Sequence, residues 1–160
     1  MADDEPLISI ILPGDPVGKG RPRARIVTPR GKPSFIHFYT PKDTEDYEQA
    51  LAWQGKAGMR GRAPFDCALT VLVEAFVPIP ASWSKPKRAA AVSGDLPAMS
   101  KPDADNYAKI ALDGLNKIVW ADDASVVSLQ AIKRYSDFPR LRVSAWRWDD
   151  MGPSEPEMEI

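Results

Sequence analysis

The sequence is poor in residue types on which several common chemistries depend. Its 160 residues include one cysteine, Cys67, and one histidine, His37. A single cysteine excludes an internal disulfide and is typical of the reducing cytosol, where we expect this chain. The histidine alternates with apolar residues. A single histidine argues against nucleases that bind metal through histidines and against histidine-dependent catalytic triads.

Long hydrophobic runs are also missing. No apolar run approaches the roughly 18 residues that span a bilayer, and the acidic first five residues are unlike a secretory signal. We therefore expect no membrane association. The content of 44% hydrophobic and 27% charged residues is that of a globular protein, and 160 residues suffice for one domain with its own core.

The net charge of −1 conceals an uneven distribution. Of the 22 acidic residues, eight lie in residues 1–5 and 149–160, which contain no lysine or arginine. The rest of the chain has 21 basic against 14 acidic residues, a net charge of +7. A basic body suits an anionic partner such as nucleic acid, although a soluble protein with uneven charge explains the number equally well.

Hydrophobic periodicity predicts strands and helices in one domain at residues 7–148. Residues 1–6 and 149–160 are predicted to be disordered and acidic. The predicted strands are residues 7–12, 26–28 with 34–39 as a hairpin, 68–77, 124–135 and 140–148. One predicted helix begins at Asp43 or Thr44, one lies between Ser84 and Gly94, and one begins at Asp105 or Asn106.

Two segments gather basic residues outside the predicted strands. The glycine- and proline-rich loop 14–25 carries four cations, Lys19, Arg21, Arg23 and Arg25. It is not a phosphate-binding P-loop, because Arg21 replaces the hydroxyl residue that binds magnesium. The short helix in the insertion 80–100 adds Lys85, Lys87 and Arg88. Both segments are predicted to contact a nucleic-acid backbone, and the alternative for each is a solvated surface.

Acidic residues cluster at two places near the third predicted helix. Asp103 and Asp105 precede it, and the pair Asp122 and Asp123 follows it. Carboxylates spaced this way could hold a hard cation, or they could simply cap the helix and a turn. An EF-hand is excluded, because Ala108 and Gly114 occupy the positions of its invariant glycine and glutamate.

Two further charged residues allow alternative interpretations. Lys109 lies one turn into the helix, where it could serve a phosphate site or form an exposed ion pair with Asp105 or Asp113. Glu74 interrupts an apolar strand, so it should face either the acidic site or an arginine.

The ordered combination of these motifs resembles the RusA family of Holliday junction resolvases. The resemblance rests on Lys101-Pro102-Asp103-Ala104-Asp105-Asn106, on Lys109, and on Val119-Trp120-Ala121-Asp122-Asp123. It extends to the loop from Gly18 to Arg23 and to Tyr39-Thr40-Pro41, which resemble features of phage-borne members, and it covers most of residues 7–148. The long insertion before Lys101 and the acidic tail depart from the shortest members.

The resemblance implies an α+β fold, with a mixed β-sheet and helices packed on one face, in an intimate homodimer. It implies a Mg²⁺-dependent endodeoxyribonuclease, with Mn²⁺ as a substitute and without an organic cofactor, that acts on four-way DNA junctions. The family's metal-binding and catalytic acids match Asp103, Asp105 and Asp123, and its catalytic lysine matches Lys109. Lys101 joins the predicted DNA-binding residues, and Asp122 would orient its neighbour or cap the turn.

Two other functions remain open from the sequence. One is a non-catalytic DNA-binding protein of the same fold. The other is a metal-dependent transferase that acts on a small substrate and has no use for the basic loop.

Overall fold

The computed structural model describes residues 5–148. Residues 1–4 and all of 149–160 lie outside the described part, so the disorder predicted for them stays a prediction. Between residues 5 and 148, no helix combines the length and the apolar character needed to cross a membrane.

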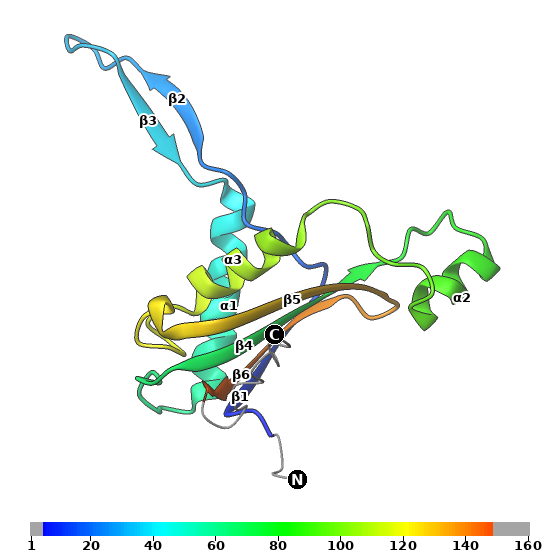
Figure 1. Ribbon diagram of the computed structural model, residues 1–160. Coiled ribbons are helices and arrows are strands. Elements are labelled where there is room, and N and C mark those ends of the chain that lie inside the picture. The colour runs from blue at the N-terminus through cyan, green and yellow to red at the C-terminus, as the bar shows by residue number, and fades with distance from the viewer. Residues whose placement is uncertain (1–4, 149–160) are drawn as a thin grey trace, which may run out of the picture.

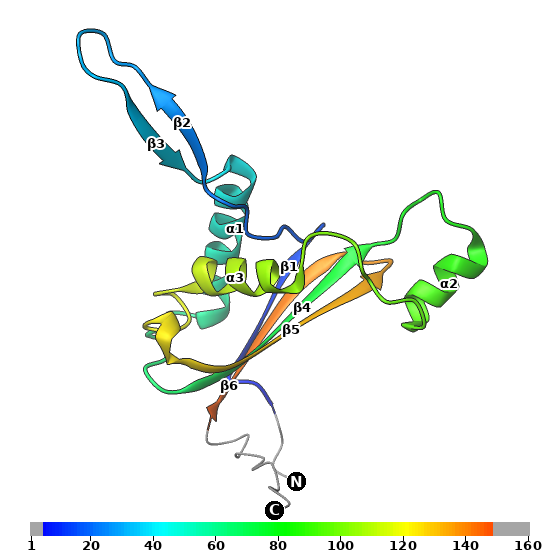
Figure 2. The same cartoon turned by 45° about the horizontal axis from the view of Figure 1, so that its top comes forward.

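A four-stranded mixed sheet forms the centre of the molecule (Figure 1). The strand order is β1-β6-β4-β5, in which β4 runs antiparallel to β6 and parallel to β5. The bounds are β1 Ile8–Pro13, β4 Leu69–Pro78, β5 Val126–Ser136 and β6 Arg140–Arg147. Helices α1 (Lys42–Met59) and α3 (Ala104–Leu115) cross one face of this sheet (Figure 2). The predicted α+β fold, with helices on one face, is confirmed.

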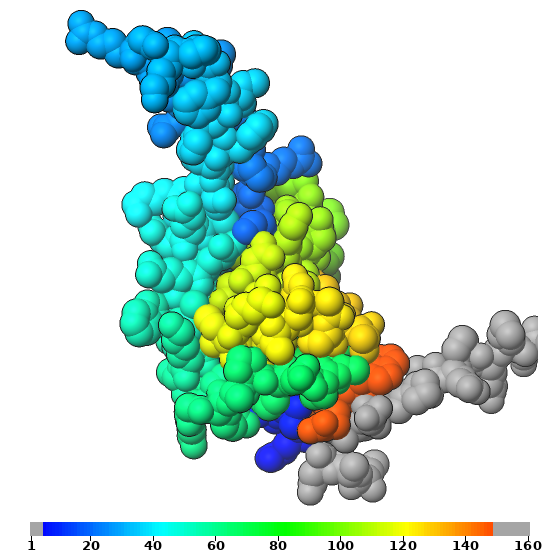
Figure 3. All heavy atoms as spheres, turned by 90° about the vertical axis from the view of Figure 1, so that its left-hand side faces the viewer, coloured from blue at the N-terminus to red at the C-terminus, as the bar shows by residue number. Residues whose placement is uncertain are grey.

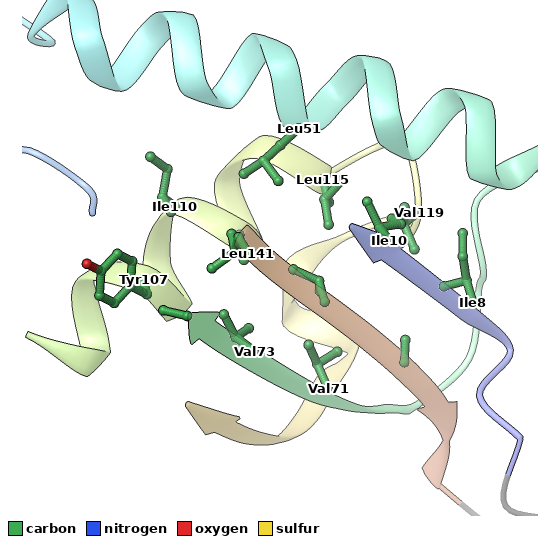
Figure 4. Close-up of a cluster of buried hydrophobic side chains, with 14 of the residues drawn as sticks. Ile8, Ile10, Leu51, Val71, Val73, Tyr107, Ile110, Leu115, Val119 and Leu141 are labelled. Atoms are coloured by element: carbon green, nitrogen blue, oxygen red, sulfur yellow. The ribbon is translucent and has the colours of Figure 1, made fainter. Parts of the chain in front are cut away.

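Alternate side chains of β4 form the apolar face on which the helices pack. Val71, Val73 and Ala75 are almost completely buried beneath the helices, and the residues between them point to the other face. The apolar residues of α3 recur at helical spacing, so Ile110 and Leu115 reach the same core (Figure 4). Burial of this cluster fixes α3 on the sheet.

The connection from β4 to β5 is a crossover, because parallel neighbours cannot be joined by a tight turn. It contains α2 (Lys85–Ser93) and then α3, which brings the acidic residues to both ends of α3. Helix α2 begins after Ser84 and ends at Gly94, whose φ of 89° is the left-handed conformation that favours glycine. Both ends of α2 are as predicted.

A second sheet consists of a single hairpin, β2 (Arg23–Val27) with β3 (Phe35–Tyr39). It projects from the body of the molecule beyond the N-terminal end of α1 (Figures 1 and 3). The turn contains Gly31, with a φ of 75°, as predicted for the Arg30-Gly31 turn.

Predicted boundaries are wrong by a few residues at β2, α1, α3 and β5. Strand β2 begins at Arg23, so it includes the last residues of the predicted loop 14–25. Helix α1 begins at Lys42 after Pro41, and the Thr44 hydroxyl accepts a hydrogen bond from the Gly20 N–H (3.1 Å) instead of capping the helix. Helix α3 begins at Ala104, so Asp103 is its N-cap residue. A 3-10 turn, Asp123–Ser125, precedes β5 and delays the start of that strand.

Candidate active site at the two ends of helix α3

Asp103 and Asp105 lie at the N-terminus of α3. Asp103 has extended backbone at the N-cap position and Asp105 lies in the first helical turn. The partial positive charge of a helix N-terminus favours carboxylates and other anions at this place. Lys101 Nζ lies 2.7 Å from each carboxylate oxygen of Asp103. The hydrogen bond from Lys101 lowers the pKa of Asp103, and the charges of Lys133 and Arg21 lower it further.

The loop that carries Asp103 is fixed from two sides. Lys133 on β5 donates hydrogen bonds from Nζ to the backbone oxygens of Ser100 (2.6 Å) and Pro102 (2.9 Å). On the other side Gly18 packs so closely that an added Cβ would lie 2.7 Å from Cβ of Pro102. Sequence reasoning missed Lys133. The sequence signal that could have indicated it is a lysine on the covered face of the sheet, because Lys133 pairs in register with Ala75 beneath the helices.

The acidic pair Asp122 and Asp123 lies at the other end of α3. Asn116, which follows the last helical residue, accepts a hydrogen bond on Oδ1 from the Asp123 N–H (3.1 Å). Asp122 caps the 3-10 turn by accepting a hydrogen bond from the Ala124 N–H (3.1 Å), and its Oδ2 lies 3.7 Å from Lys117 Nζ. Capping the turn is therefore one role of Asp122.

The two carboxylates of this pair crowd one another. The hydrogen bond with Asp122 raises the pKa of Asp123, and burial and the charges of Asp122 and Asp113 add to the rise. Conversely, the Ala124 N–H lowers the pKa of Asp122, as do its hydrogen bond with Asp123 and the charge of Lys117. A cation beside the pair would relieve this repulsion.

Helix α3 separates the two acidic groups. Its 12 residues give an axial length of roughly 18 Å, whereas oxygens that share one Mg²⁺ lie about 4 Å apart at most. Across residues 5–148, no three His, Cys, Asp or Glu side chains are grouped closely enough to hold a metal ion. One chain thus brings Asp103 and Asp105 to one place and Asp123 to another, and the metal-binding role of all three stays a prediction.

The donor chemistry of these residues nevertheless fits a hard cation. All three offer carboxylate oxygens, and Mg²⁺ in phosphate-transfer sites commonly takes one or two carboxylates together with phosphate oxygens and waters. Asp103 and Asp105 at a helix N-terminus meet that requirement.

Lys109 lies on the exposed side of α3 between the two acidic groups. Among the described residues it has no carboxylate within 4.0 Å, and Asp113 is paired with Lys19 Nζ instead (2.8 Å). The alternative of an ion pair between Lys109 and Asp105 or Asp113 is therefore wrong. The catalytic role of Lys109 stays a prediction.

The basic loop passes directly over the start of α3. The Lys19 N–H donates a hydrogen bond to the backbone oxygen of Asn106 (2.9 Å). The Lys19 ammonium group pairs with Glu48 on α1 and Asp113 on α3, so it ties the loop to both helices. Arg21 is exposed beside Asp103, whereas Arg23 and Arg25 lie on strand β2 of the hairpin. DNA binding by these four residues stays a prediction. In the structure without DNA, the Lys19 ammonium group is paired with carboxylates.

The basic residues of α2 lie at the far end of the sheet (Figure 1). Arg88 donates to Asp137 (3.2 Å), and Lys87 Nζ lies 4.0 Å from the centroid of the Trp83 ring. Lys85 is exposed. Their predicted DNA contacts are likewise untested.

Glu74 does not belong to the acidic site. It lies on the face of the sheet away from the helices and accepts a hydrogen bond from Arg142 Nε, its cross-strand neighbour on β6 (2.6 Å). Of the two partners expected for Glu74, the structure therefore shows the arginine. Arg142 is half-exposed, so the pair neutralises an otherwise buried carboxylate.

Comparison with known proteins identifies the family. The family model described as endodeoxyribonuclease RusA matches residues 13–145, which include every acidic and basic residue of the candidate site. The uncharacterized protein YqaN of Bacillus subtilis (strain 168) is 34% identical over 138 residues, or 85% of this chain and 93% of YqaN. This chain belongs to the RusA endodeoxyribonuclease family.

Proposed function

We propose that this protein is a Mg²⁺-dependent, structure-selective endodeoxyribonuclease that resolves four-way junctions and other branched DNA in recombination and repair. The observation that carries the proposal is the contact between the basic loop and the start of α3. Through Gly18 and the Lys19 N–H, a cationic segment lies against Pro102 and Asn106, which flank both acids. A phosphate backbone held by Arg21 would therefore pass beside Asp103.

Asp103 and Asp105 would hold the metal ion, and Asp123 would complete its ligand set. A bound Mg²⁺, or Mn²⁺ in its place, lowers the pKa of water and stabilises the charge that develops in phosphoryl transfer. Lys109 lies one turn after Asp105 and has no carboxylate within 4.0 Å in the part of the chain that the structure describes, so it would bind the scissile phosphate or neutralise the leaving oxygen. When the metal binds to Asp103, Lys101 would leave its ion pair with this carboxylate and bind a DNA phosphate instead.

The separation of the acids along α3 favours a homodimer. β5 is an edge strand of 11 residues whose Val127 and Leu129 are about half exposed. A long, apolar, unpaired edge is a template for pairing with another chain. Pairing of two β5 strands about a two-fold axis is antiparallel, so the start of one strand faces the end of the other.

Such a dimer would bring together the two halves of the acidic site. Asp123 begins the turn that leads into β5, whereas Lys133 near its end contacts the loop of Asp103. In the dimer, the acidic pair of one copy would therefore lie toward Asp103 and Asp105 of the other. Two complete sites would result, one for each of two opposed DNA strands.

The alternative functions make different predictions about DNA and metal. A non-catalytic DNA-binding protein of this fold would bind junctions without cutting them. A transferase for small substrates would have no affinity for DNA, and membership of a nuclease family weighs against it.

The decisive experiment is cleavage of labelled four-way, replication-fork and linear duplex DNA with and without Mg²⁺. Wild type should cut branched DNA only with the metal. Asp105→Asn should bind but not cut, and Lys109→Ala should cut slowly. Undiminished cleavage by Asp105→Asn would refute the metal site, and binding should weaken steeply with salt because phosphate contacts dominate.

A further inference from the structure

The β2–β3 hairpin is an exposed ribbon that no other helix or strand of residues 5–148 covers. Nine of its ten strand residues are exposed, and it stands clear of the body (Figure 3). Three of its apolar side chains are among the most exposed in the described chain: Ile26 is 76%, Phe38 69% and Ile36 62% exposed. Apolar surface of this kind usually marks a binding site.

The register gives the hairpin two chemically different faces. Directly paired residues of an antiparallel ribbon point to the same side, and the sides alternate along each strand. One side, the arginine face, contains Arg23, Arg25 and Val27 with Phe35, His37 and Tyr39. The other side, the apolar face, contains Ala24, Ile26, Ile36 and Phe38.

The arginine face combines positive charge with flat rings. The guanidinium carbon of Arg25 lies 5.5 Å from the centroid of the Tyr39 ring. The rings of His37 and Tyr39 are nearly parallel at 9°, with centroids 6.3 Å apart. Residues 16–42 contain seven lysines and arginines and no acid, so nothing in this segment repels a phosphate backbone.

Nucleic acid with unstacked bases matches both faces. Arginine and aromatic rings together bind phosphates and stack on bases, and apolar side chains such as Phe and Ile insert between base steps that they unstack. A two-stranded ribbon also has the dimensions to enter a DNA groove. Base pairs that end without a stacked neighbour are found at the centre of an open junction.

We propose that the hairpin inserts at the branch point of DNA and holds it open. The apolar face covers the exposed base pairs through Ile36 and Phe38, while Arg23 and Arg25 bind the flanking phosphates. This inference rests on the proposed action on branched DNA, and it adds the element that recognises the branch.

The test uses full-length protein and a four-way junction with 2-aminopurine at the branch point, in EDTA so that no strand is cut. Wild type should raise the fluorescence, because the base becomes unstacked. Ile36→Ser with Phe38→Ser should still bind the junction but should lose most of this rise. Phe138→Ser, which changes an equally exposed aromatic residue at the β5–β6 turn, is the matched control and should behave as wild type.

Each other outcome would overturn the inference in a distinguishable way. If the fluorescence rises as much with the double variant as with wild type, the hairpin does not act at the branch point. Mg²⁺-dependent cleavage by wild type would still support the nuclease function in that case. No junction binding by wild type would refute both. Dissociation of a dimer into monomers by the double variant, seen by light scattering, would assign the apolar face to a second copy instead.

Discussion

Lys133 Nζ lies 2.9 Å from the backbone oxygen of Pro102, the residue immediately before Asp103. A second hydrogen bond to Ser100 (2.6 Å) makes this lysine a clamp on the loop, although it contacts neither acid directly. A strand at the edge of the sheet thereby determines where the first carboxylate of the site lies.

Loss of this clamp should impair catalysis through the position of Asp103. Hydrogen bonds from charged groups contribute about 1.5–3 kcal/mol, so Lys133→Met should slow Mg²⁺-dependent cleavage by roughly tenfold to a hundredfold. Mg²⁺ affinity, measured by calorimetry without DNA, should fall as well. Lys133→Arg, which keeps the charge and the donors, should recover part of both. Reduced stability with unchanged metal affinity would show that Lys133 has only a structural role.

Removal of Lys101 should have the opposite effect on metal binding. Its ammonium group occupies both oxygens of Asp103, and a cation must displace it. Water screens an exposed ion pair and leaves it weak, so Lys101→Met should bind Mg²⁺ only slightly more tightly than wild type without DNA. Its affinity for junction DNA should fall, because one phosphate contact is lost. Weaker metal binding in this variant would contradict the competition.

Mixed dimers test whether two chains share each site. Asp105→Asn and Asp123→Asn should each be inactive as homodimers. In a shared-site heterodimer, both substitutions fall in one site and the other site is intact, so nicking of one strand should return. If each site came from a single chain, the heterodimer would have two damaged sites and no activity. Tagged chains purified as heterodimers and assayed on a labelled junction distinguish the two cases.

High pH should reveal the ion pairs of Lys19. Burial alone would lower the pKa of this lysine, but hydrogen bonds and charges of Asp113 and Glu48 outweigh it and raise the pKa above the usual 10.5. The stabilisation of the folded state by these ion pairs is therefore complete at a pH below 10.5, the pKa of Lys19 in the unfolded chain. It is lost as the pH rises through the higher pKa of Lys19 in the folded protein.

Urea unfolding from pH 8 to 12 measures this effect. Lys19→Met should be less stable than wild type at pH 8, and its free energy of unfolding should fall less steeply above pH 10. Lys42→Met is the control, because Lys42 is fully exposed and its pairing with Asp46 is screened by water. Parallel curves for wild type and Lys19→Met would contradict the stabilising role of the partly buried ion pairs of Lys19.

Local chemistry in the sequence was enough to predict most of the elements. Ser84 and Gly94 bound α2 as expected, and the alternation in β4 places Glu74 on the opposite face from Val73. The sequence could not reveal that a side chain suited to cap a helix forms a hydrogen bond with a distant part of the chain instead. Thr44 has the chemistry of a cap, but its hydroxyl accepts a hydrogen bond from the Gly20 N–H, and α1 begins before it at Lys42.

The candidate site shows the same limit over a longer range. Spacing and resemblance indicate the acids, but a crossover helix between β4 and β5 puts its two ends far apart. Asp103 and Asp123 therefore occupy opposite ends of α3. The number of residues between the two motifs does not reveal this separation. Lys133 was missed because its importance comes from backbone oxygens of a loop that precedes it by about 30 residues.

The close packing at Gly18 has a consequence for the position of the cut. Because an added Cβ would lie 2.7 Å from Cβ of Pro102 and 3.2 Å from Cβ of Asn106, the loop that leads into the hairpin cannot move closer to α3 at Gly18. With the hairpin at the branch point, the fold determines how many nucleotides separate that point from the bond at Asp103. Junctions with different arm sequences should therefore be nicked at the same distance from the branch.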